Sequence, residues 1–230
     1  MLGRSLTRNS SGFFVCRSSR RRVSASRQSA SARQTAHAAG RPHPGRFILV
    51  TGGTRSGKSR FAVHLARRFG RRVVYIATCN VADADAEMRQ RIARHQLDRP
   101  RSWRTVEHPP DPAHTLRHLK GKAAGAILDC LTMYVSARLV RGDSDAVIAQ
   151  NVRRLCDAIR RVSYPVIVIT NEVGSSVVPD HPLGRRFRDL AGLANQIAAS
   201  CADDVVLMVA GIPLRVKGEG VLLDGHARAT

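Results

Sequence analysis

The sequence predicts an α/β fold, with a mostly parallel β-sheet covered by helices on both faces. Short, continuously apolar runs alternate along the chain with longer stretches whose apolar residues recur every three or four positions. Strands buried on both faces read as such runs, and parallel strands need helical crossovers between them. A Gly-rich turn joins the first run to the first helical stretch, and polar residues follow several runs. In such a sheet these polar residues lie where ligands bind, beyond the carboxyl ends of the strands.

The apolar runs and helical stretches define the expected elements in order. The strands are expected at 47–50, 73–78, 126–131, 166–170 and 205–209. The helices are expected at 58–69, 84–96, 144–162 and 184–200, where apolar residues repeat with helical spacing. Residues 99–125 contain four prolines, so we expect an irregular segment with one short helix near Leu116.

Composition divides the chain into a basic extension, residues 1–46, and one folded domain, residues 47–230. The extension holds ten Arg and no Asp or Glu, and it is rich in Ser, Ala and Gln. It has too little apolar surface to offset the entropy lost on folding, so we expect it to be disordered. Its composition resembles that of a transit peptide, and a start codon assigned too far upstream is another interpretation.

Charge and cysteine content narrow the classes of partner and compartment. The net charge of +21 is compatible with a nucleic-acid-binding module, but aromatic residues make up only 4% and no nucleic-acid-binding motif is present. We therefore expect no nucleic-acid partner. No apolar run approaches the roughly 18 residues of a membrane span, so we expect a soluble protein. The five cysteines are scattered without a C-x-x-C pair, which favours a reducing, cytoplasmic location.

The Gly-rich turn matches the phosphate-binding motif G-x-x-x-x-G-K-[ST] in full. It follows a predicted strand and begins a predicted helix, which is the context that the motif requires. Its residues are Gly52, Gly53, Thr54, Arg55, Ser56, Gly57, Lys58 and Ser59. Backbone N–H groups of such a loop point at phosphate oxygens, and its lysine supplies positive charge to the β- and γ-phosphates. The motif predicts a P-loop NTPase-like domain that uses ATP or GTP as a substrate.

A Mg²⁺ site is expected beside this loop. The hydroxyl of Ser59 is a metal ligand in the motif, and Asp129 ends an apolar run, as a metal-binding acid of this fold does. The alternative is that Asp129 is a solvated residue at a strand end. Glu172 is a further candidate.

Further motifs resemble the bifunctional adenosylcobinamide kinase / adenosylcobinamide-phosphate guanylyltransferase family. They keep the family's order from about Phe47 to Lys217. They are Ile48–Arg60, Tyr75–Thr78, Arg91–His95, Arg99–Glu107, Thr170–Gly174, Val178–Pro179, Arg186–Gly192 and Gly211–Pro213. The resemblance implies phosphorylation of adenosylcobinamide, then transfer of GMP from GTP to adenosylcobinamide phosphate with release of pyrophosphate. It also implies a homo-oligomer, a trimer in the family.

The resemblance also implies particular functional residues. The family's guanylylated histidine corresponds to His95. Nucleotide contacts are implied for Cys79, Asn80, Val81, Gln96, Leu97, Asp98, Arg99, Glu107 and Asp129. The family commonly has Glu where this chain has Asp129.

Helical spacing alone gives His95 a second interpretation. Met88, Ile92 and His95 fall on one helix face, and a histidine on an apolar face is usually a packed core residue. However, Arg91 and Arg94 lie nearby, and arginine suits phosphate binding. A neutral imidazole can attack phosphorus near pH 7 because its ordinary pKa is about 6.5. The alternative function is another small-molecule kinase, which would have the same phosphate loop but would perform no guanylyl transfer.

Overall fold

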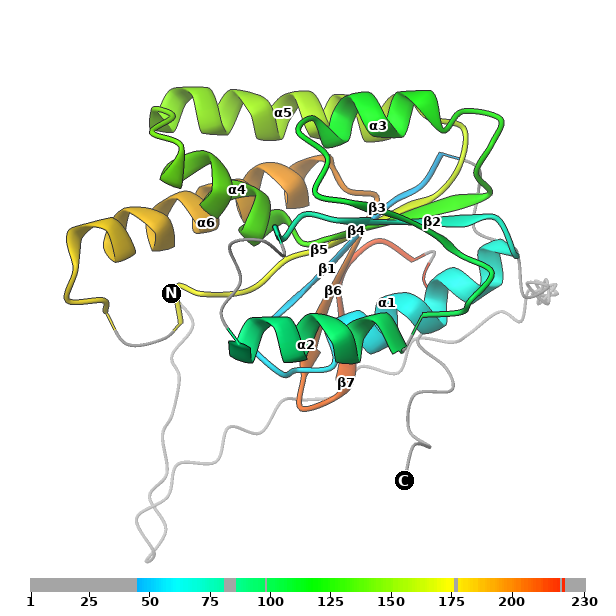
Figure 1. The fold of residues 1–230 in the computed structure, drawn as a ribbon, viewed down its shortest axis with the longest axis horizontal. Helices are drawn as coiled ribbons and strands as arrows, with labels where there is room; N and C mark the ends of the chain where they lie inside the picture. Colours follow the sequence, from blue (N-terminus) through cyan, green and yellow to red (C-terminus); the bar gives the residue numbers. More distant parts are fainter. Residues whose placement is uncertain (1–44, 81–85, 98, 176–177, 220, 222–230) are drawn as a thin grey trace, which may run out of the picture. The chain divides into compact units, whose positions relative to one another are not determined.

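A seven-stranded sheet with helices on both faces makes up the described part of the chain (Figure 1). The structure, a computed structural model, describes residues 45–80, 86–97, 99–175, 178–219 and 221. The strands are β1 (Phe47–Gly52), β2 (Val73–Ala77), β3 (Arg104–Glu107), β4 (Gly125–Asp129), β5 (Val166–Ile169), β6 (Asp204–Val209) and β7 (Ile212–Lys217). Their order is β3-β2-β4-β5-β1-β6-β7, and all neighbouring pairs are parallel except β6 and β7.

The helices form two layers around this sheet. They are α1 (Lys58–Ala66), which continues as a 3₁₀ turn (Arg67–Phe69), α2 (Ala86–Leu97), α3 (Pro112–His118), α4 (Leu131–Val140), α5 (Asp145–Arg161) and α6 (Pro182–Cys201). Figure 1 shows α3, α4, α5 and α6 on one face and α1 and α2 on the other. The buried apolar residues form two clusters, one on each face of the sheet, because alternate residues of each strand point to opposite faces. Phe47 and Leu49 pack under the four-helix layer, whereas Ile48 and Val50 pack against α1.

The predicted α/β class is confirmed, and the five predicted strands correspond to β1, β2, β4, β5 and β6. Two strands and one helix were not predicted. β3 and β7 lie at the two edges of the sheet, and α4 begins directly after β4 without an intervening turn. The irregular segment predicted at 99–125 contains β3 as well as the expected short helix.

Arg46 directly precedes β1 and contacts the sheet, although the composition of residues 1–46 groups it with the extension. Its guanidinium forms an ion pair with Asp204, whose side chain is only 1% exposed, and this hydrogen bond raises the pKa of Arg46. The backbone carbonyl of Arg46 accepts a hydrogen bond from the N–H of Val166 at 2.8 Å. The rest of the predicted extension, residues 1–44, lies outside the described residues.

Candidate active site

The phosphate loop connects β1 to α1, as the motif predicts. The backbone conformation of this turn requires two glycines. Gly57 precedes α1 with a φ of +93°, a left-handed conformation that L side chains rarely adopt. At Gly52 a Cβ atom would lie 2.5 Å from the carbonyl oxygen of Met208 on β6, so only glycine lets these strands approach. Backbone geometry thus requires glycine at these two positions of the loop.

Lys58 is the buried charge of this loop. It is 6% exposed, and its Nζ donates hydrogen bonds to the Gly53 carbonyl at 2.6 Å and to Ser56 Oγ at 3.4 Å. These bonds hold the ammonium group inside the turn, at the N-terminal end of α1. An anion at this end would meet both the lysine and the positive end of the helix dipole.

Asp129 lies across from the loop at the carboxyl end of β4. Ser59 donates a hydrogen bond from Oγ to Asp129 Oδ2 at 3.2 Å, and the Tyr75 hydroxyl donates to the same oxygen. Burial, followed by the nearby Asp129 carboxylate, raises the pKa of Tyr75 well above its ordinary value. The tyrosine hydroxyl therefore remains a hydrogen-bond donor. The serine hydroxyl and the carboxylate are hard oxygen ligands held side by side, which fits the coordination chemistry of Mg²⁺.

Arg99 follows α2 and covers the ring of Tyr75. Its guanidinium carbon lies 3.6 Å from the ring centroid, a cation–π contact. Its Nη1 lies 3.5 Å from Thr105 Oγ1 and 3.9 Å from Glu107 Oε1 on β3. The side chain is 9% exposed, and its Nε atom is buried with no hydrogen-bond partner in the described part of the chain.

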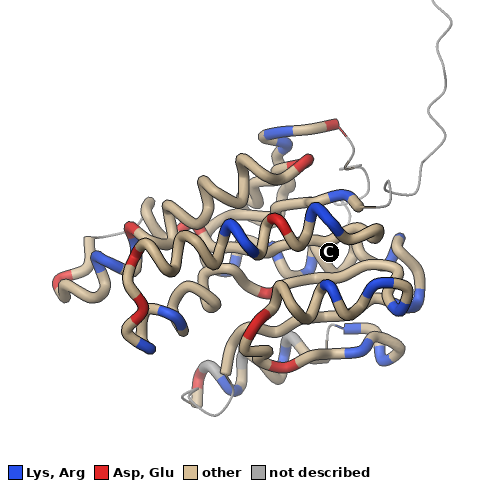
Figure 2. The backbone as a smooth tube through the Cα atoms, turned by 90° about the horizontal axis from the view of Figure 1, so that it is seen from above, with Lys and Arg blue, Asp and Glu red and all other residues tan. Residues whose placement is uncertain are grey.

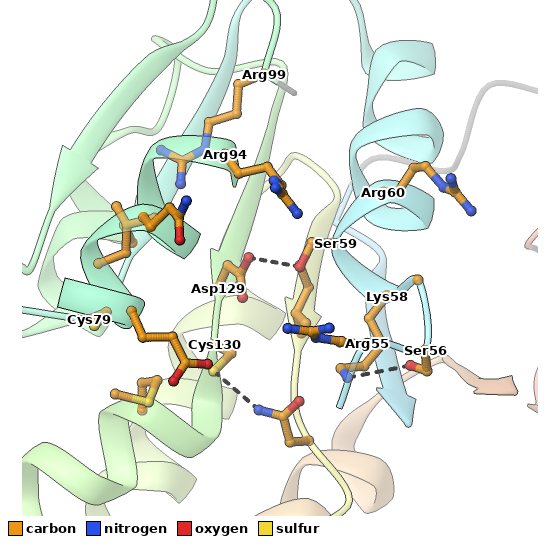
Figure 3. Close-up of a pocket in the computed structure, with 18 of the residues that line it drawn as sticks. Arg55, Ser56, Lys58, Ser59, Arg60, Cys79, Arg94, Arg99, Asp129 and Cys130 are labelled. Atoms are coloured by element: carbon orange, nitrogen blue, oxygen red, sulfur yellow. Dashed lines mark hydrogen bonds between the residues drawn. The ribbon is translucent and has the colours of Figure 1, made fainter. Parts of the chain in front are cut away.

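A cavity of about 680 Å³ lies between the phosphate loop and α2. Figure 3 shows Lys58 and Ser59 on one side, Arg94 and Arg99 on the other, and Asp129 between them. The sequence-predicted residues that line it are Arg55, Ser56, Gly57, Lys58, Ser59, Cys79, Arg99, Glu107 and Asp129. The structure therefore brings together residues from the loop and from four separate strand or helix ends.

Other sequence-predicted residues lie elsewhere or are not described. Gly52, Gly53 and Thr54 belong to the phosphate loop but do not line the cavity, and neither does Asn80 after β2. Gln96 and Leu97 end α2 with exposed side chains, and Leu97 lines a smaller hollow with Trp103. Val81 and Asp98 lie outside the described residues. The backbone of His95 lies within α2, and its side chain is outside what the structure describes.

Further residues line the cavity. They are Arg60, Ala77, Glu87, Gln90, Ile92, Arg94, Cys130, Met133, Ile169 and Asn171. Two of them had signals in the sequence, because Arg94 was considered for phosphate binding beside His95 and Asn171 follows an apolar run. Met133 had none, because the helix α4 was not predicted, and Cys130 was assigned only to the strand predicted at 126–131.

Cys130 is a buried thiol in the wall of this cavity. Burial, with the neighbouring Asp129 charge, raises the pKa of Cys130 to about 11. Its Sγ lies 3.1 Å from Thr132 Oγ1, which also accepts a hydrogen bond from Asn171 Nδ2 at 3.1 Å. The thiol is therefore protonated near neutral pH and is a packing group rather than a nucleophile.

Glu172 links the chain segments beside the loop through hydrogen bonds. Its Oε1 accepts hydrogen bonds from Thr51 Oγ1 at 2.6 Å and from Asn195 Nδ2 at 3.0 Å. Its backbone N–H donates to the Gly52 carbonyl at 3.0 Å. Glu172, a further candidate metal ligand from the sequence, thus braces the base of the phosphate loop and does not line the cavity.

Acidic and basic residues are interspersed along the described part of the chain. Figure 2 shows Lys and Arg positions along the backbone, with Asp and Glu positions among them. Among the described residues, no three His, Cys, Asp or Glu side chains gather in a metal-binding group. Within the same part of the chain, no helix is long and apolar enough to cross a membrane.

Comparison with known proteins identifies relatives over most of the sequence. The family model described as cobinamide kinase / cobinamide phosphate guanyltransferase matches residues 48–216. The bifunctional adenosylcobalamin biosynthesis protein of Pseudomonas aeruginosa is 39% identical over 171 residues, which cover 74% of this chain and 97% of that protein. Proteins of the same name from Escherichia coli and Salmonella typhimurium are each 38% identical, over 183 and 190 residues. These matches cover 74% of this chain and 99% of each relative.

Proposed function

We propose that this chain, which belongs to the cobinamide kinase / cobinamide phosphate guanyltransferase family, catalyses both reactions for which the family is named. In the first, adenosylcobinamide is phosphorylated by ATP or GTP. In the second, GMP passes from GTP to adenosylcobinamide phosphate, giving adenosylcobinamide-GDP and pyrophosphate. The observation that carries this proposal is one cavity lined by the phosphate loop on one side and by α2, the helix of His95, on the other.

The phosphate loop is suited to the first reaction. The acceptor hydroxyl attacks the γ-phosphorus, the bond to the β-phosphate oxygen breaks, and a nucleoside diphosphate leaves. Such a transfer needs positioning and charge stabilisation more than covalent chemistry. Lys58 would supply that stabilisation because its ammonium group is already held inside the turn, and the N-terminal end of α1 would add the positive end of the helix dipole.

The second reaction needs a nucleophile, and we assign this role to His95. Its imidazole would attack the α-phosphorus of GTP and displace pyrophosphate, forming an N–P bond to GMP. An oxygen of adenosylcobinamide phosphate would then take the GMP group and release the histidine. Arg94 and Arg99 line the same cavity, and their guanidinium groups suit the negative phosphate oxygens.

We further propose Ser59 and Asp129 as Mg²⁺ ligands, since their oxygens lie 3.2 Å apart at the cavity. A bound Mg²⁺ would neutralise charge on the transferred phosphates. We propose a cytoplasmic trimer with no nucleic-acid partner. The interspersed acidic and basic residues support the absence of a nucleic-acid partner. The trimer is what the resemblance in sequence implies.

Two radioactive labels test the proposed reactions separately. Adenosylcobinamide incubated with nucleotide labelled at the γ-phosphate should yield a labelled corrinoid. Adding GTP labelled at the α-phosphate should then label a second, GDP-containing corrinoid. Transfer of the γ-label without the α-label would favour a simple small-molecule kinase. Failure of both transfers with active, folded protein would contradict the proposed function.

A further inference from the structure

The relative position of β2 and β4 gives the Tyr75 hydroxyl access to Asp129. Tyr75 pairs with Ile127 in the parallel register, and Asp129 lies two residues further along β4. These side chains share the sheet face that α1 covers, so a long aromatic side chain can reach the strand end diagonally. The hydroxyl donates its hydrogen bond to Asp129 Oδ2, the oxygen that also receives the Ser59 hydroxyl.

The Tyr75 ring is held in place from both sides. It is 1% exposed and belongs to the cluster that packs on α1. The guanidinium of Arg99 covers the ring at 3.6 Å, and Arg99 is itself held by Thr105 on β3. A ring packed in this way has little freedom, so its hydroxyl defines a fixed point for the carboxylate.

We infer that Tyr75 is a positioning residue, which orients the Asp129 carboxylate for a divalent metal ion bound with nucleotide at Ser59. The Ser59 hydroxyl donates to Oδ2 of Asp129, and the buried Tyr75 hydroxyl is a second donor to the same oxygen. The Tyr75 donor comes from a packed ring inside the sheet, so it restricts rotation of the carboxylate at the cavity wall. Groups that orient metal ligands in this way affect metal affinity by about tenfold or more when removed. The inference rests on the proposed function in taking the cavity as a metal–nucleotide site.

Tyr75→Phe tests this inference because it removes the hydroxyl and keeps the packed ring. Mn²⁺ bound together with β,γ-imido ATP can be followed by the relaxation of water protons, without any turnover. We expect Mn²⁺ to bind about tenfold more weakly to Tyr75→Phe than to the wild type. Binding of the nucleotide in the presence of EDTA should change less than twofold. Unchanged Mn²⁺ affinity in Tyr75→Phe would overturn the inference.

Tyr164→Phe is the matched control. Tyr164 is also buried, at 4% exposure, and its hydroxyl donates to the Leu116 carbonyl at 2.5 Å, on the other face of the sheet. This variant loses a buried hydrogen bond of its own, so it reports the effect of lower stability alone. Its Mn²⁺ affinity should equal that of the wild type. An equal loss of affinity in both variants would overturn a specific role for Tyr75.

A double-mutant cycle shows whether Tyr75 acts through Asp129. In an Asp129→Asn background, adding Tyr75→Phe should weaken Mn²⁺ binding by less than twofold, because the carboxylate is already lost. A further tenfold loss would overturn the inference. If the wild type gives no relaxation enhancement with Mn²⁺ and nucleotide, the proposed metal–nucleotide site itself is wrong. If instead the wild type binds Mn²⁺ with nucleotide and Tyr75→Phe binds it equally well, only the role of Tyr75 is wrong.

Discussion

Hydrogen bonds between a few side chains define the chemistry of the cavity. Lys58 is held by the loop that it serves, and Asp129 receives hydroxyl groups from two different elements. Both side chains make hydrogen bonds within the protein, so much of the geometry exists before a ligand binds. Pre-organised charge of this kind stabilises a transition state without reorganisation during the reaction.

Lys58→Ala should reduce cobinamide phosphorylation by about a hundredfold or more, because it removes charge at the developing phosphate oxygens. Thermal unfolding should show that the variant is folded. Lys217→Ala is a suitable control, since its Nζ donates to the carbonyls of Ala199 and Ser200 at the far end of α6. Near-normal phosphorylation by Lys58→Ala would exclude this loop as the kinase site.

Cys130 should resist alkylation at pH 8. Its pKa of about 11 leaves roughly one thiol in a thousand ionised, and only the thiolate reacts with iodoacetamide. Cys79 lines the same cavity and is half-buried, which makes it an internal reference. Peptide mapping by mass spectrometry should show Cys79 modified before Cys130. Faster labelling of Cys130 would contradict the protonated, packed state.

At the scale of elements, burial decided what the sequence could predict. The central strands are continuous apolar runs because both faces are covered, and all of them were predicted. β3 and β7 lie at the edges of the sheet and have no fully buried residue, so they lack this signal. β7 also begins with Ile212–Pro213, and a proline within a run argues against a strand except at an edge. The phosphate loop and Asp129 were predicted from a motif and a strand end, whereas Cys79, Arg99 and Glu107 were implied only by the resemblance. Most single side chains that α2 and α4 contribute to the cavity were missed.

Packing between β4 and the turn after α1 gives a prediction about stability. A Cβ atom at Gly125 would lie 3.0 Å or less from the Cβ, Cγ and Cδ2 atoms of Phe69. Gly125→Ala should therefore lower the free energy of unfolding by about 1–3 kcal/mol through overpacking. Urea denaturation measures this change.

Gly192→Ala provides the opposite case. Gly192 lies within α6, and a Cβ atom there would have no neighbour within 4 Å. Alanine should stabilise the protein by about 0.5–1 kcal/mol through its higher helix propensity. If both substitutions changed the free energy of unfolding equally, close contact with Phe69 would not be the reason that Gly125→Ala destabilises the protein.

At the scale of the whole molecule, the extension and the folded domain should be separable. A chain lacking residues 1–45 should keep the midpoint of thermal unfolding and both proposed activities, because it retains Arg46 and its ion pair with Asp204. Adding Arg46→Ala to the shortened chain should lower the free energy of unfolding by about 3 kcal/mol, since it leaves the buried Asp204 carboxylate without its partner. Loss of cooperative unfolding on removal of residues 1–45 alone would refute this division.

The central claim is that one cavity carries both transfers, with His95 as the nucleophile of the second. The most direct test is covalent labelling of the protein by GTP labelled at the α-phosphate, with the wild type and His95→Ala compared. The wild type should acquire acid-labile GMP that maps to His95 and is discharged by adenosylcobinamide phosphate. His95→Ala should acquire no label and should still phosphorylate adenosylcobinamide, because phosphoryl transfer to a hydroxyl needs no protein nucleophile. Label that persists on His95→Ala, or a wild type that takes up none during turnover, would contradict the account.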